Sequence, residues 1–501
     1  MLSLGIISLL TAIINYTNFS IANAPDRIKS INTRKVLGSS NFVLRMSLIS
    51  EAVILCLLSY IITILLLYYI NTTFLKEFLT ASVAIEKNIK IYIIGIIIPI
   101  VAGLIAGVYP AYYITSFPAA LALKGTFSLS PTGVKFRNVL IGFQYIITFI
   151  IIIAASFIYS QNYYMQHTDL GFNKDQIIVT NFEWGDNSAR DFLSNELKRN
   201  PHIENVGFAN GVISSNTSIM SWGRSYNGNR VDFTAFPVDE NMFDILELTL
   251  IDGRKFSELD KLSPNGALLM NETAIKQYDI KINDQIADIP ILGTFKDFHF
   301  KPMNTAIEPM ALFLKPQNNW GNFLTAYIKV KAKSNMFETM DFVKKTIKKN
   351  YPEYTESPMF YDTILQNTYQ NEKYVSALVS LFGFASILIS IVGVFGLVLL
   401  ECHSKEKKIG VRRVYGASVN QIILSFNKIY IKILVLCFVI SVPFGVAITK
   451  KWMENFAYRI SISWWMFLLV FIAVLLITVA TVSVQVFKSA NNNPVDNLKS
   501  E

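Results

Sequence analysis

The chain has 501 residues, of which 52% are hydrophobic and 16% charged, and its formal net charge is +9. The apolar residues are concentrated in blocks, which excludes an ordinary soluble globular protein and indicates a membrane protein with one water-facing region. The basic residues lie mainly in short loops beside these blocks. That pattern is typical of residues that set membrane orientation and argues against nucleic-acid binding.

Seven apolar runs are long enough to cross a bilayer as helices, because a span needs about 20 predominantly apolar residues. They lie at about 2–22, 52–70, 91–113, 138–160, 374–400, 433–449 and 460–487. The first run has no charged segment before it, so it does not resemble a signal peptide. We expect the first half to lack one span and one outer domain relative to the second; the alternative is a natural seven-span protein.

Basic residues crowd three of the loops between these runs. They are Arg27, Lys29, Arg34, Lys35 and Arg45 in the first loop, Lys124, Lys135 and Arg137 in the third, and Lys405, Lys407, Lys408, Arg412 and Arg413 in the fifth. The other short loops pair basic residues with acids. The asymmetry predicts that these three loops and the C-terminus are cytoplasmic, and that the N-terminus and the large polar region face outward.

Glycine and proline interrupt two of the apolar runs. In the third run, Pro99, Gly103, Gly107 and Pro110 fit either a close-packing face or a bend. The same two interpretations apply to the sixth run, which contains a proline and a glycine at 443 and 445.

The polar region at about 161–373 alternates strand and helix patterns, which predicts an α+β domain. Strands are expected at 176–180 and 326–330 and helices at 188–198 and 335–349, with a second subdomain at about 210–290. This region has no cysteine, and the histidines His167, His202, His299 and His403 form no metal-spaced pair. The sequence therefore predicts neither a metal site nor a catalytic site.

One short stretch occurs twice in the chain. Arg34-Lys35-Val36-Leu37-Gly38-Ser39-Ser40 recurs 378 positions later as Arg412-Arg413-Val414-Tyr415-Gly416-Ala417-Ser418. Each copy lies in a basic loop between two apolar runs. We call residues 26–40 the first elbow and residues 404–418 the second elbow. The repeat indicates a duplicated membrane unit whose halves present equivalent cytoplasmic surfaces.

The second elbow predicts a short helix over 405–415, with Ser404 as its N-cap and Ile409, Val414 and Tyr415 available to pack. Gly416 can end this helix in the left-handed conformation. Ser418 and Gln421 then form a capping-box pattern for the next helix. The elbows could serve only to bind anionic lipid or only to fix topology. Neither role explains why glycine and serine recur at matching places, so we favour a protein docking site.

The second elbow resembles a known family in Glu406-Lys-Lys-Ile-Gly-Val-Arg-Arg-Val-Tyr-Gly-Ala-Ser418. This segment is similar to the loop signature of FtsX-like permeases, the membrane subunits of MacB-type ABC transporters. Segments 238–243, 253–256, 271–274 and 293–300 are similar to the MacB-like periplasmic core domain. The resemblance is to the duplicated permeases of Bacteroidetes, which have eight spans and two periplasmic domains. It therefore implies that this chain is N-terminally truncated.

The resemblance implies a membrane α-helical protein of two FtsX-like halves with an α+β periplasmic core. Its parts would be a first half at 1–125, a span opening the second half at 126–160, the core at 161–373 and a second half at 374–501. The first elbow reads Asp26-Arg-Ile-Lys-Ser-Ile-Asn-Thr-Arg34 and lacks the acidic-Ile-Gly pattern of the family. That departure bears on whether both elbows engage a partner equally.

By resemblance, a cytoplasmic ABC ATPase dimer docks on the elbows. The implied docking residues are Arg34, Lys35, Gly38, Glu406, Lys408, Ile409, Gly410, Arg412, Arg413, Val414, Gly416 and Ser418. No Gly-Lys dipeptide occurs, so the chain lacks a phosphate-binding loop of its own, and ATP-Mg would be used by the partner. A periplasmic adaptor and an outer-membrane channel are further implied partners. The expected function is export from the bacterial inner membrane; the alternative is an FtsX-type signal relay to a periplasmic enzyme.

Overall fold

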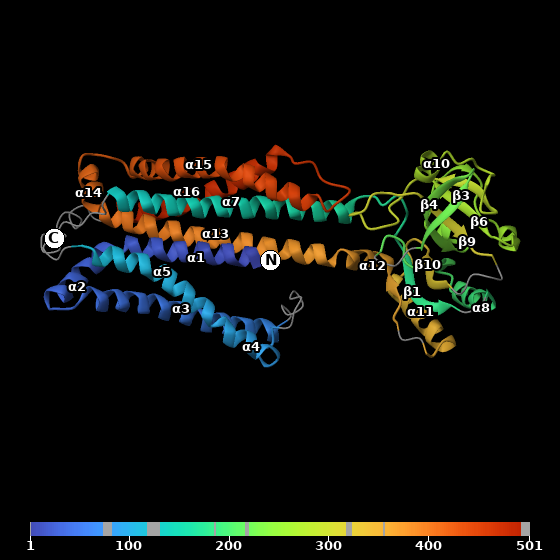
Figure 1. The fold of residues 1–501 in the computed structure, drawn as a ribbon, viewed down its shortest axis with the longest axis horizontal. Helices are drawn as coiled ribbons and strands as arrows, with labels where there is room; N and C mark the ends of the chain where they lie inside the picture. The colour runs from blue at the N-terminus through green and yellow to red at the C-terminus, as the bar shows by residue number, and fades with distance from the viewer. Residues whose placement is uncertain are drawn as a thin grey trace. The chain divides into compact units, whose positions relative to one another are not determined.

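The computed structural model describes residues 2–73, 83–117, 131–184, 187–215, 220–316, 323–353 and 356–491 (Figure 1). The chain divides into two compact units, which we describe separately. The helical unit comprises 1–161, 374–452 and 461–501, and the outer unit comprises 162–373 and 453–460. Lys124 and the boundary expected between 125 and 126 lie outside the described residues.

The helical unit contains the seven helices that the apolar runs predict. Among the described residues, seven are long and apolar enough to cross a membrane. Their helices are α1 (Leu2–Ala22), α3 (Asn41–Thr72), α4 and α5 (Ile85–Gly95 and Ile97–Thr115, one span), α7 (Pro131–His167), α13 (Gln370–Ser404), α15 (Val419–Met453) and α16 (Trp464–Ala490). Two short helices, α2 (Ala24–Val36) and α14 (Glu406–Val414), stand between these spans. The predicted membrane α-helical fold is confirmed.

The glycines of α5 form a close-packing face against α3. A Cβ built on Gly103 would lie 2.6 Å from the Cα of Val53, and one built on Gly107 would lie 3.0 Å from the Cβ of Ala52. Such contacts are possible only where a helix lacks side chains, which is how small residues bring membrane helices together. Of the two interpretations of these glycines, the structure supports close packing.

In the second half, α7 packs along α15 and α16. The ring centroid of Phe149 lies 5.3 Å from that of Phe438 and 6.4 Å from that of Phe471. The Tyr145 hydroxyl lies 3.1 Å from the Thr478 hydroxyl. Aromatic pairs and hydroxyl contacts of this kind hold helices together where both lipid and protein are apolar. The halves of the unit meet at α1 and α13, where the Asn15 amide donates to the Ile389 carbonyl at 3.1 Å.

The outer unit is built on a mixed sheet of eleven strands among its described residues. The strands are β1 (Ile177–Trp184), β2 (Ile203–Ala209), β3 (Met220–Tyr226), β4 (Asn229–Val238), β5 (Leu250–Gly253), β6 (Ala267–Asn271), β7 (Gln285–Ile286), β8 (Ile289–Phe295), β9 (Met310–Leu314), β10 (Phe323–Val330) and β11 (Met359–Phe360). The order is β11-β1-β10-β2-β4-β9-β6-β8-β5, with β3 on β4 and β7 on β8. β4 and β9 pair in parallel, as do β6 and β8.

Six helices accompany this sheet in the described residues. They are α8 (Asn187–Lys198), α9 (Met242–Ile245), the 3-10 helix η2 (Glu258–Leu262), α10 (Glu272–Tyr278), α11 (Met336–Asn350) and α12 (Tyr361–Thr368). The Asn335 side chain caps α11 by accepting from the backbone N–H groups of Phe337 and Glu338. The predicted helices at 188–198 and 335–349 are thus present, and the α+β class is confirmed.

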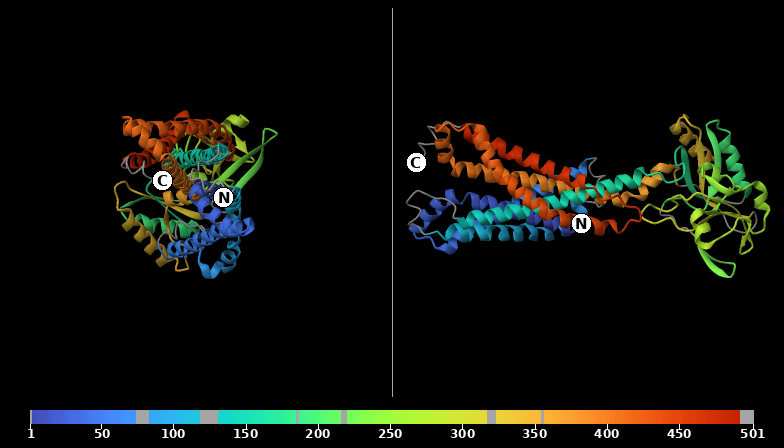
Figure 2. Two further views of the ribbon diagram at one scale, coloured as in Figure 1. Left: turned by 90° about the vertical axis from the view of Figure 1, so that its left-hand side faces the viewer. Right: turned by 90° about the horizontal axis from the view of Figure 1, so that it is seen from above.

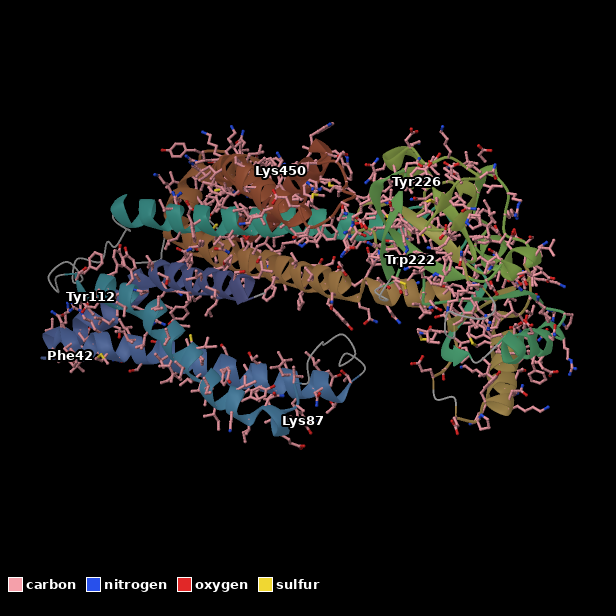
Figure 3. All side chains as sticks on the ribbon, turned by 45° about the vertical axis from the view of Figure 1, so that its right-hand side comes forward. Phe42, Lys87, Tyr112, Trp222, Tyr226 and Lys450 are labelled. Carbon is pink, nitrogen blue, oxygen red and sulfur yellow. The ribbon has the colours of Figure 1, made fainter. Side chains whose placement is uncertain are left out.

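The sheet carries two separate hydrophobic cores. One core joins α8 and α11 to β1, β2 and β10, around residues such as Leu197, Ile328 and Val343. The other lies under β3, β4, β6, β8 and β9 and includes Trp222 and Tyr226, which Figure 3 labels. Only one residue pair, Ala209 with Val238, links β2 to β4 in register. The second core includes residues of β9 as well as residues within the predicted 210–290, and both cores lie on one sheet of one compact unit.

The segment 453–460 between α15 and α16 belongs to the outer unit. The Ala457 N–H donates to the Asn304 carbonyl at 3.0 Å. The Ile307 N–H donates to the Tyr458 hydroxyl at 3.3 Å, and the Tyr458 and His299 ring centroids are 4.7 Å apart. Backbone and ring contacts together fix this segment on the residues that follow β8.

A buried carboxyl group joins the two parts of the sheet. Asp239 accepts hydrogen bonds from the backbone N–H groups of Phe208 at 2.9 Å, Asn241 at 3.1 Å and Met242 at 3.2 Å. Burial, and next the neighbouring Glu240 charge, raise the pKa of Asp239 to about 7 against the opposing effect of the N–H donors. Here the loss of hydration outweighs the hydrogen bonds.

The raised pKa of Asp239 predicts a pH-dependent stability. Between about pH 4 and pH 7 the folded unit keeps a proton that the unfolded chain has lost, so the free energy of unfolding falls as pH rises. The slope reaches about 1.4 kcal/mol per pH unit. Urea unfolding followed by tryptophan fluorescence at several pH values should show this slope in the natural protein and lose it in Asp239→Asn. An equal slope in both proteins would remove the assignment.

Candidate functional site

The two elbows end their helices with the same backbone hydrogen bonds. After α2, the N–H of Gly38 donates to Lys35 O and that of Ser39 to Arg34 O, both at 3.0 Å. After α14, the matching N–H groups of Gly416 and Ala417 donate to Arg413 O and Arg412 O, again at 3.0 Å. The repeat thus encodes one helix-ending motif, in which a left-handed residue lets two N–H groups reach back to the last turn.

Both glycines adopt a left-handed backbone, which the sequence predicts for Gly416. Gly38 has φ +98° and Gly416 has φ +88°. Beyond them, the Ser40 hydroxyl accepts from the Val43 N–H at 3.4 Å and begins α3. Ser418 and Gln421 form the predicted capping box, with bonds of 3.0 and 3.3 Å, and begin α15. Each elbow is therefore a fixed corner between a short helix and a membrane span.

Matching residues of the two elbows are also buried or exposed to the same degree. Residues 31–40 and 409–418 show the same succession of buried, half-buried and exposed residues, position for position. Ile31 and Ile409 are the buried anchors, 7% and 3% exposed. α2 contacts α5, and α14 contacts α16, so each elbow rests on the last span of its own half. In Figures 1 and 2, α2 and α14 lie at the same end of the helical unit.

Two expectations about the elbows were wrong. Ser404 is the last residue of α13 and not the N-cap of α14; the capping position is Lys405, whose side chain makes no cap bond. Val414 and Tyr415 do not pack within the chain, since they are 66% and 86% exposed. The first elbow keeps an isoleucine at the position of Ile409, which is Ile31, but Ile28 and Asn32 stand at the positions of Glu406 and Gly410, so the full family pattern is absent there.

The remaining predicted docking residues divide into buried and exposed groups. Ile409 and Gly410 are buried, and Lys35 and Arg413 are half-buried. Arg34 and Arg412 are exposed, as are Gly38, Lys408, Val414, Gly416 and Ser418. Glu406 lies 3.4 Å from the His403 ring nitrogen at the start of α14. Ile409 and Gly410 are therefore not available to a partner, whereas the exposed and half-buried residues of the predicted set are.

The first elbow is tied to the end of α5 by basic side chains. The Lys35 ammonium donates to the Thr115 carbonyl at 2.5 Å, and Arg45 Nε donates to the Thr115 hydroxyl at 2.9 Å. The Arg45 guanidinium also lies 4.0 Å from the ring centroid of Tyr112, which Figure 3 labels. Positive charge at a helix C-terminus is favourable, because unpaired carbonyls gather there. Burial, and next the Arg45 charge, lower the pKa of Lys35.

The second elbow is tied to its neighbours differently. The Lys405 ammonium lies 2.6 Å from Glu401 Oε1, and the Tyr430 hydroxyl donates to Glu401 Oε2 at 3.2 Å. In the first elbow, Arg27 occupies the position of Lys405 and binds Glu51 on α3 through two bonds of 2.7 and 2.9 Å. Each elbow thus holds its first basic residue with a carboxylate, but the carboxylates come from different helices.

Each elbow carries an exposed apolar pair that sequence reasoning did not assign to docking as a pair. Val36 and Leu37 are 67% and 81% exposed, close to the 66% and 86% of Val414 and Tyr415. The signal was present in the repeat, which places two apolar residues directly before each glycine. Beside the second pair is an open groove of about 460 Å³, lined by Val411, Arg412, Tyr415, Gly416, Ala417, Gln421 and Ile422.

An arginine next to an exposed apolar pair is a surface suited to protein binding. Such side chains give large binding energies when a partner buries them, and arginine and tyrosine are frequent among interface hot spots. The described residues of the chain contain no group of acidic, histidine and cysteine side chains able to hold a metal ion. The exposed arginine and apolar pair of each elbow therefore favour binding of a protein partner.

The chain was compared with known proteins. The sequence model described as FtsX-like permease C-terminal matches residues 2–119 and 380–494. No curated protein matches. Among solved structures, the chain is similar to the periplasmic region of MacB from Actinobacillus actinomycetemcomitans, with 14% identity and a TM-score of 0.30 over 40% of this chain and 96% of that chain.

Two further solved structures are similar to the chain. One is the extracellular domain of the ABC-type transporter YknZ from Gram-positive bacteria, with 14% identity and a TM-score of 0.27 over 36% of this chain and 97% of that chain. The other is a permease-protein domain from Porphyromonas gingivalis, with 15% identity and a TM-score of 0.27 over 38% and 92%. Both segments matched by the family model lie in the helical unit and include the elbows. Each half of the helical unit therefore carries a segment that matches the FtsX-like permease family model, and the chain is similar to this family over those segments.

Proposed function

We propose that this protein is the membrane subunit of a MacB-type exporter and that its two elbows bind a cytoplasmic ABC ATPase dimer. ATP-Mg binds and is hydrolysed in that partner. Closure of the dimer moves the two elbows, and the connected helices carry this motion to the outer unit. The protein lies in the bacterial inner membrane with its outer unit in the periplasm and its C-terminus in the cytoplasm.

The observation that carries this proposal is the equivalence of the elbows. Two surfaces with one backbone motif and one pattern of exposure are what a partner with two-fold symmetry requires, because such a partner offers the same site twice. Binding at both sites also strengthens the complex, since the second contact forms at a high effective concentration. A lipid-binding role would need the basic residues but not the matching glycine corners and apolar pairs.

Export is favoured over the FtsX-type relay by the size and duplication of the chain. A relay of that type needs four spans and a small outer domain, whereas this chain has two membrane halves and an outer unit with eleven strands among the described residues. A periplasmic adaptor and an outer-membrane channel would complete the export path. ATP-dependent removal of a substrate from cells supports export, whereas ATP-dependent activation of a periplasmic enzyme supports the relay.

The experiment is co-purification with a candidate ATPase encoded beside this protein, followed by measurement of ATP hydrolysis. The triple variant Arg412→Ala, Arg413→Ala and Gly416→Ala should insert into the membrane but lose the stimulation of hydrolysis. The matched control is Lys450→Ala with Lys451→Ala, which removes two exposed basic residues from the other end of α15. If the triple variant still stimulates hydrolysis, or if the control loses stimulation equally, the elbows are not the docking site.

A further inference from the structure

The first two turns of α3 and α15 match in exposure but differ in chemistry. Residues 42, 43 and 46 of α3 are exposed, and so are the corresponding residues 420, 421 and 424 of α15. Phe42 corresponds to Asn420, and Val43 corresponds to Gln421. Phe42, which Figure 3 labels, is 72% exposed, and Val43 is 59% exposed. The first elbow thus continues into an apolar surface, whereas the second continues into a polar one.

Met46 extends this apolar surface along α3. Residues three and four positions apart lie on one side of a helix, so Met46 shares a side with Val43 and Phe42. Met46 is 45% exposed, and its counterpart Leu424 is apolar as well. The two halves therefore differ at the positions of Phe42 and Val43. We call the exposed apolar pair of the first elbow and these α3 residues the first apolar surface: Val36, Leu37, Phe42, Val43 and Met46.

The short helices of the two elbows differ in charge at one matched, exposed position. Lys408 on α14 is exposed, and its counterpart on α2 is Ser30, which is exposed too. Arg412 and Arg34 are exposed at a second matched position and carry the same charge. At the position of Lys408, the second elbow therefore offers a positive group that the first elbow lacks. An acidic group on a partner complements such a charge.

The first apolar surface lies outside the hydrocarbon region of the membrane. Glu51 on α3 forms an ion pair with Arg27 at 2.7 Å, and on α15 Lys428 and Lys432 are exposed before the apolar run begins. Charged groups are costly within hydrocarbon, so both helices enter it after these residues. Phe42 precedes Glu51 by nine residues, which is about 14 Å along a helix. Lipid chains therefore do not cover Phe42, and an apolar surface in water marks a protein-binding site.

We propose that the ATPase dimer binds the first elbow mainly through apolar contact and the second elbow mainly through charge. This inference rests on the proposed function and adds the chemistry of the partner. A symmetric dimer offers the same site twice, so each site carries an apolar recess, which Phe42 fills, and a carboxylate, which pairs with Lys408. Salt screens the charged contact and leaves the apolar one, so the second elbow is the contact that salt releases first.

The test measures the dissociation constant between the full chain in detergent and the candidate ATPase of the co-purification experiment. Binding is measured at about 0.1 M and at about 1 M potassium chloride, which shortens the Debye length from about 10 Å to about 3 Å. The variants exchange matched residues between the halves: Phe42→Asn with Val43→Gln, Lys408→Ser, and Asn420→Phe. Val43→Gln copies the capping box at the start of α15, so α3 should still begin at the same residue.

We expect the variant Phe42→Asn, Val43→Gln to bind about tenfold more weakly at both salt concentrations, because covering a phenylalanine side chain contributes at least that much. Lys408→Ser should weaken binding about threefold at the lower salt concentration only, because screening removes this contribution at the higher one. Asn420→Phe should strengthen binding about tenfold at the higher salt concentration, since it adds the apolar contact to the second elbow. A gain of this kind cannot result from misfolding.

Three results would overturn the proposal. One is unchanged binding of the variant Phe42→Asn, Val43→Gln at both salt concentrations. The second is a Lys408→Ser effect of equal size at both, and the third is no gain from Asn420→Phe. If the first variant instead separates a dimer of the protein into monomers, as measured by light scattering, and binds the ATPase normally, the surface joins two copies and the proposal also falls.

The triple variant at residues 412, 413 and 416 tests the proposed function separately. If that variant loses the stimulation of ATP hydrolysis while the variant at 42 and 43 binds normally, docking at the elbows stands and the division into apolar and charged contacts fails. If the triple variant still stimulates hydrolysis, the proposed function fails, and this inference fails with it.

Discussion

Replacing Tyr415 by aspartate is expected to weaken binding of the ATPase partner by about thirtyfold, because burying an interface hot spot contributes about 2 kcal/mol or more. Tyr415 is 86% exposed and packs on nothing that would make it necessary for folding. An aspartate at this position would also have to lose its hydration when the partner covers it. The dissociation constant of the purified complex, measured in detergent, checks this prediction.

The same change at Leu37 compares the two elbows. Leu37 is 81% exposed at the matching position, but its smaller side chain buries less apolar surface, so Leu37→Asp should weaken binding less than Tyr415→Asp. Leu259→Asp is the control, since Leu259 is 75% exposed in the outer unit. If all three variants bind the ATPase like the natural protein, the apolar pairs are not the contact surface. If only Tyr415→Asp has an effect, a single elbow carries the interaction.

The second large effect is expected at the α3–α5 contact, where Gly103→Ala should destabilise the helical unit by about 1–3 kcal/mol. The new Cβ would lie 2.6 Å from the Cα and 3.0 Å from the N of Val53, and backbone atoms cannot turn aside as a side chain can. Separation of α3 from α5 would also disturb the first elbow, which rests on α5. Thermal unfolding in detergent measures the change.

Gly5→Ala is the matched control for that substitution. Gly5 lies within α1, and nothing lies within 4 Å of its Cβ position. The change should leave the helical unit as stable or slightly more stable, because alanine is favoured over glycine in a helix by about 1 kcal/mol. Opposite signs for the two glycines are therefore the expected result. A shift of the same sign and size in both would show that the close approach of α3 and α5 is not real.

Most of the helical architecture could be predicted from the sequence, because each membrane span requires a long apolar run that can be recognised without knowing its neighbours in the fold. The capping box of Ser418 and Gln421 and the left-handed Gly416 were predicted for a similar reason: their hydrogen bonds join residues a few positions apart. The alternating strands and helices of the outer unit likewise gave its class. The order of its strands involves pairing between residues far apart, and periodicity does not contain that information.

The candidate site was only partly predictable. The repeat located both elbows, but it did not show which of their residues are exposed. Tyr415 reads as a packing residue in sequence and is 86% exposed, while Gly410, expected to dock, is buried. Lys35 was assigned to a partner, yet its ammonium binds the Thr115 carbonyl at the end of α5. Exposure is set by which span lies beside the elbow, and that is a property of the folded helices.

The sequence by itself determined that this protein is a duplicated membrane protein with two matching basic elbows, because duplication and membrane insertion are both recorded in local patterns of apolar and basic residues. Only the tertiary structure decided that residues of the same repeat have unlike surroundings, as with Ser441 beneath α7 and Thr63 exposed on α3. The physical reason is that the burial of a residue depends on which helix packs against it, whereas the repeat specifies only the residues of its own helix.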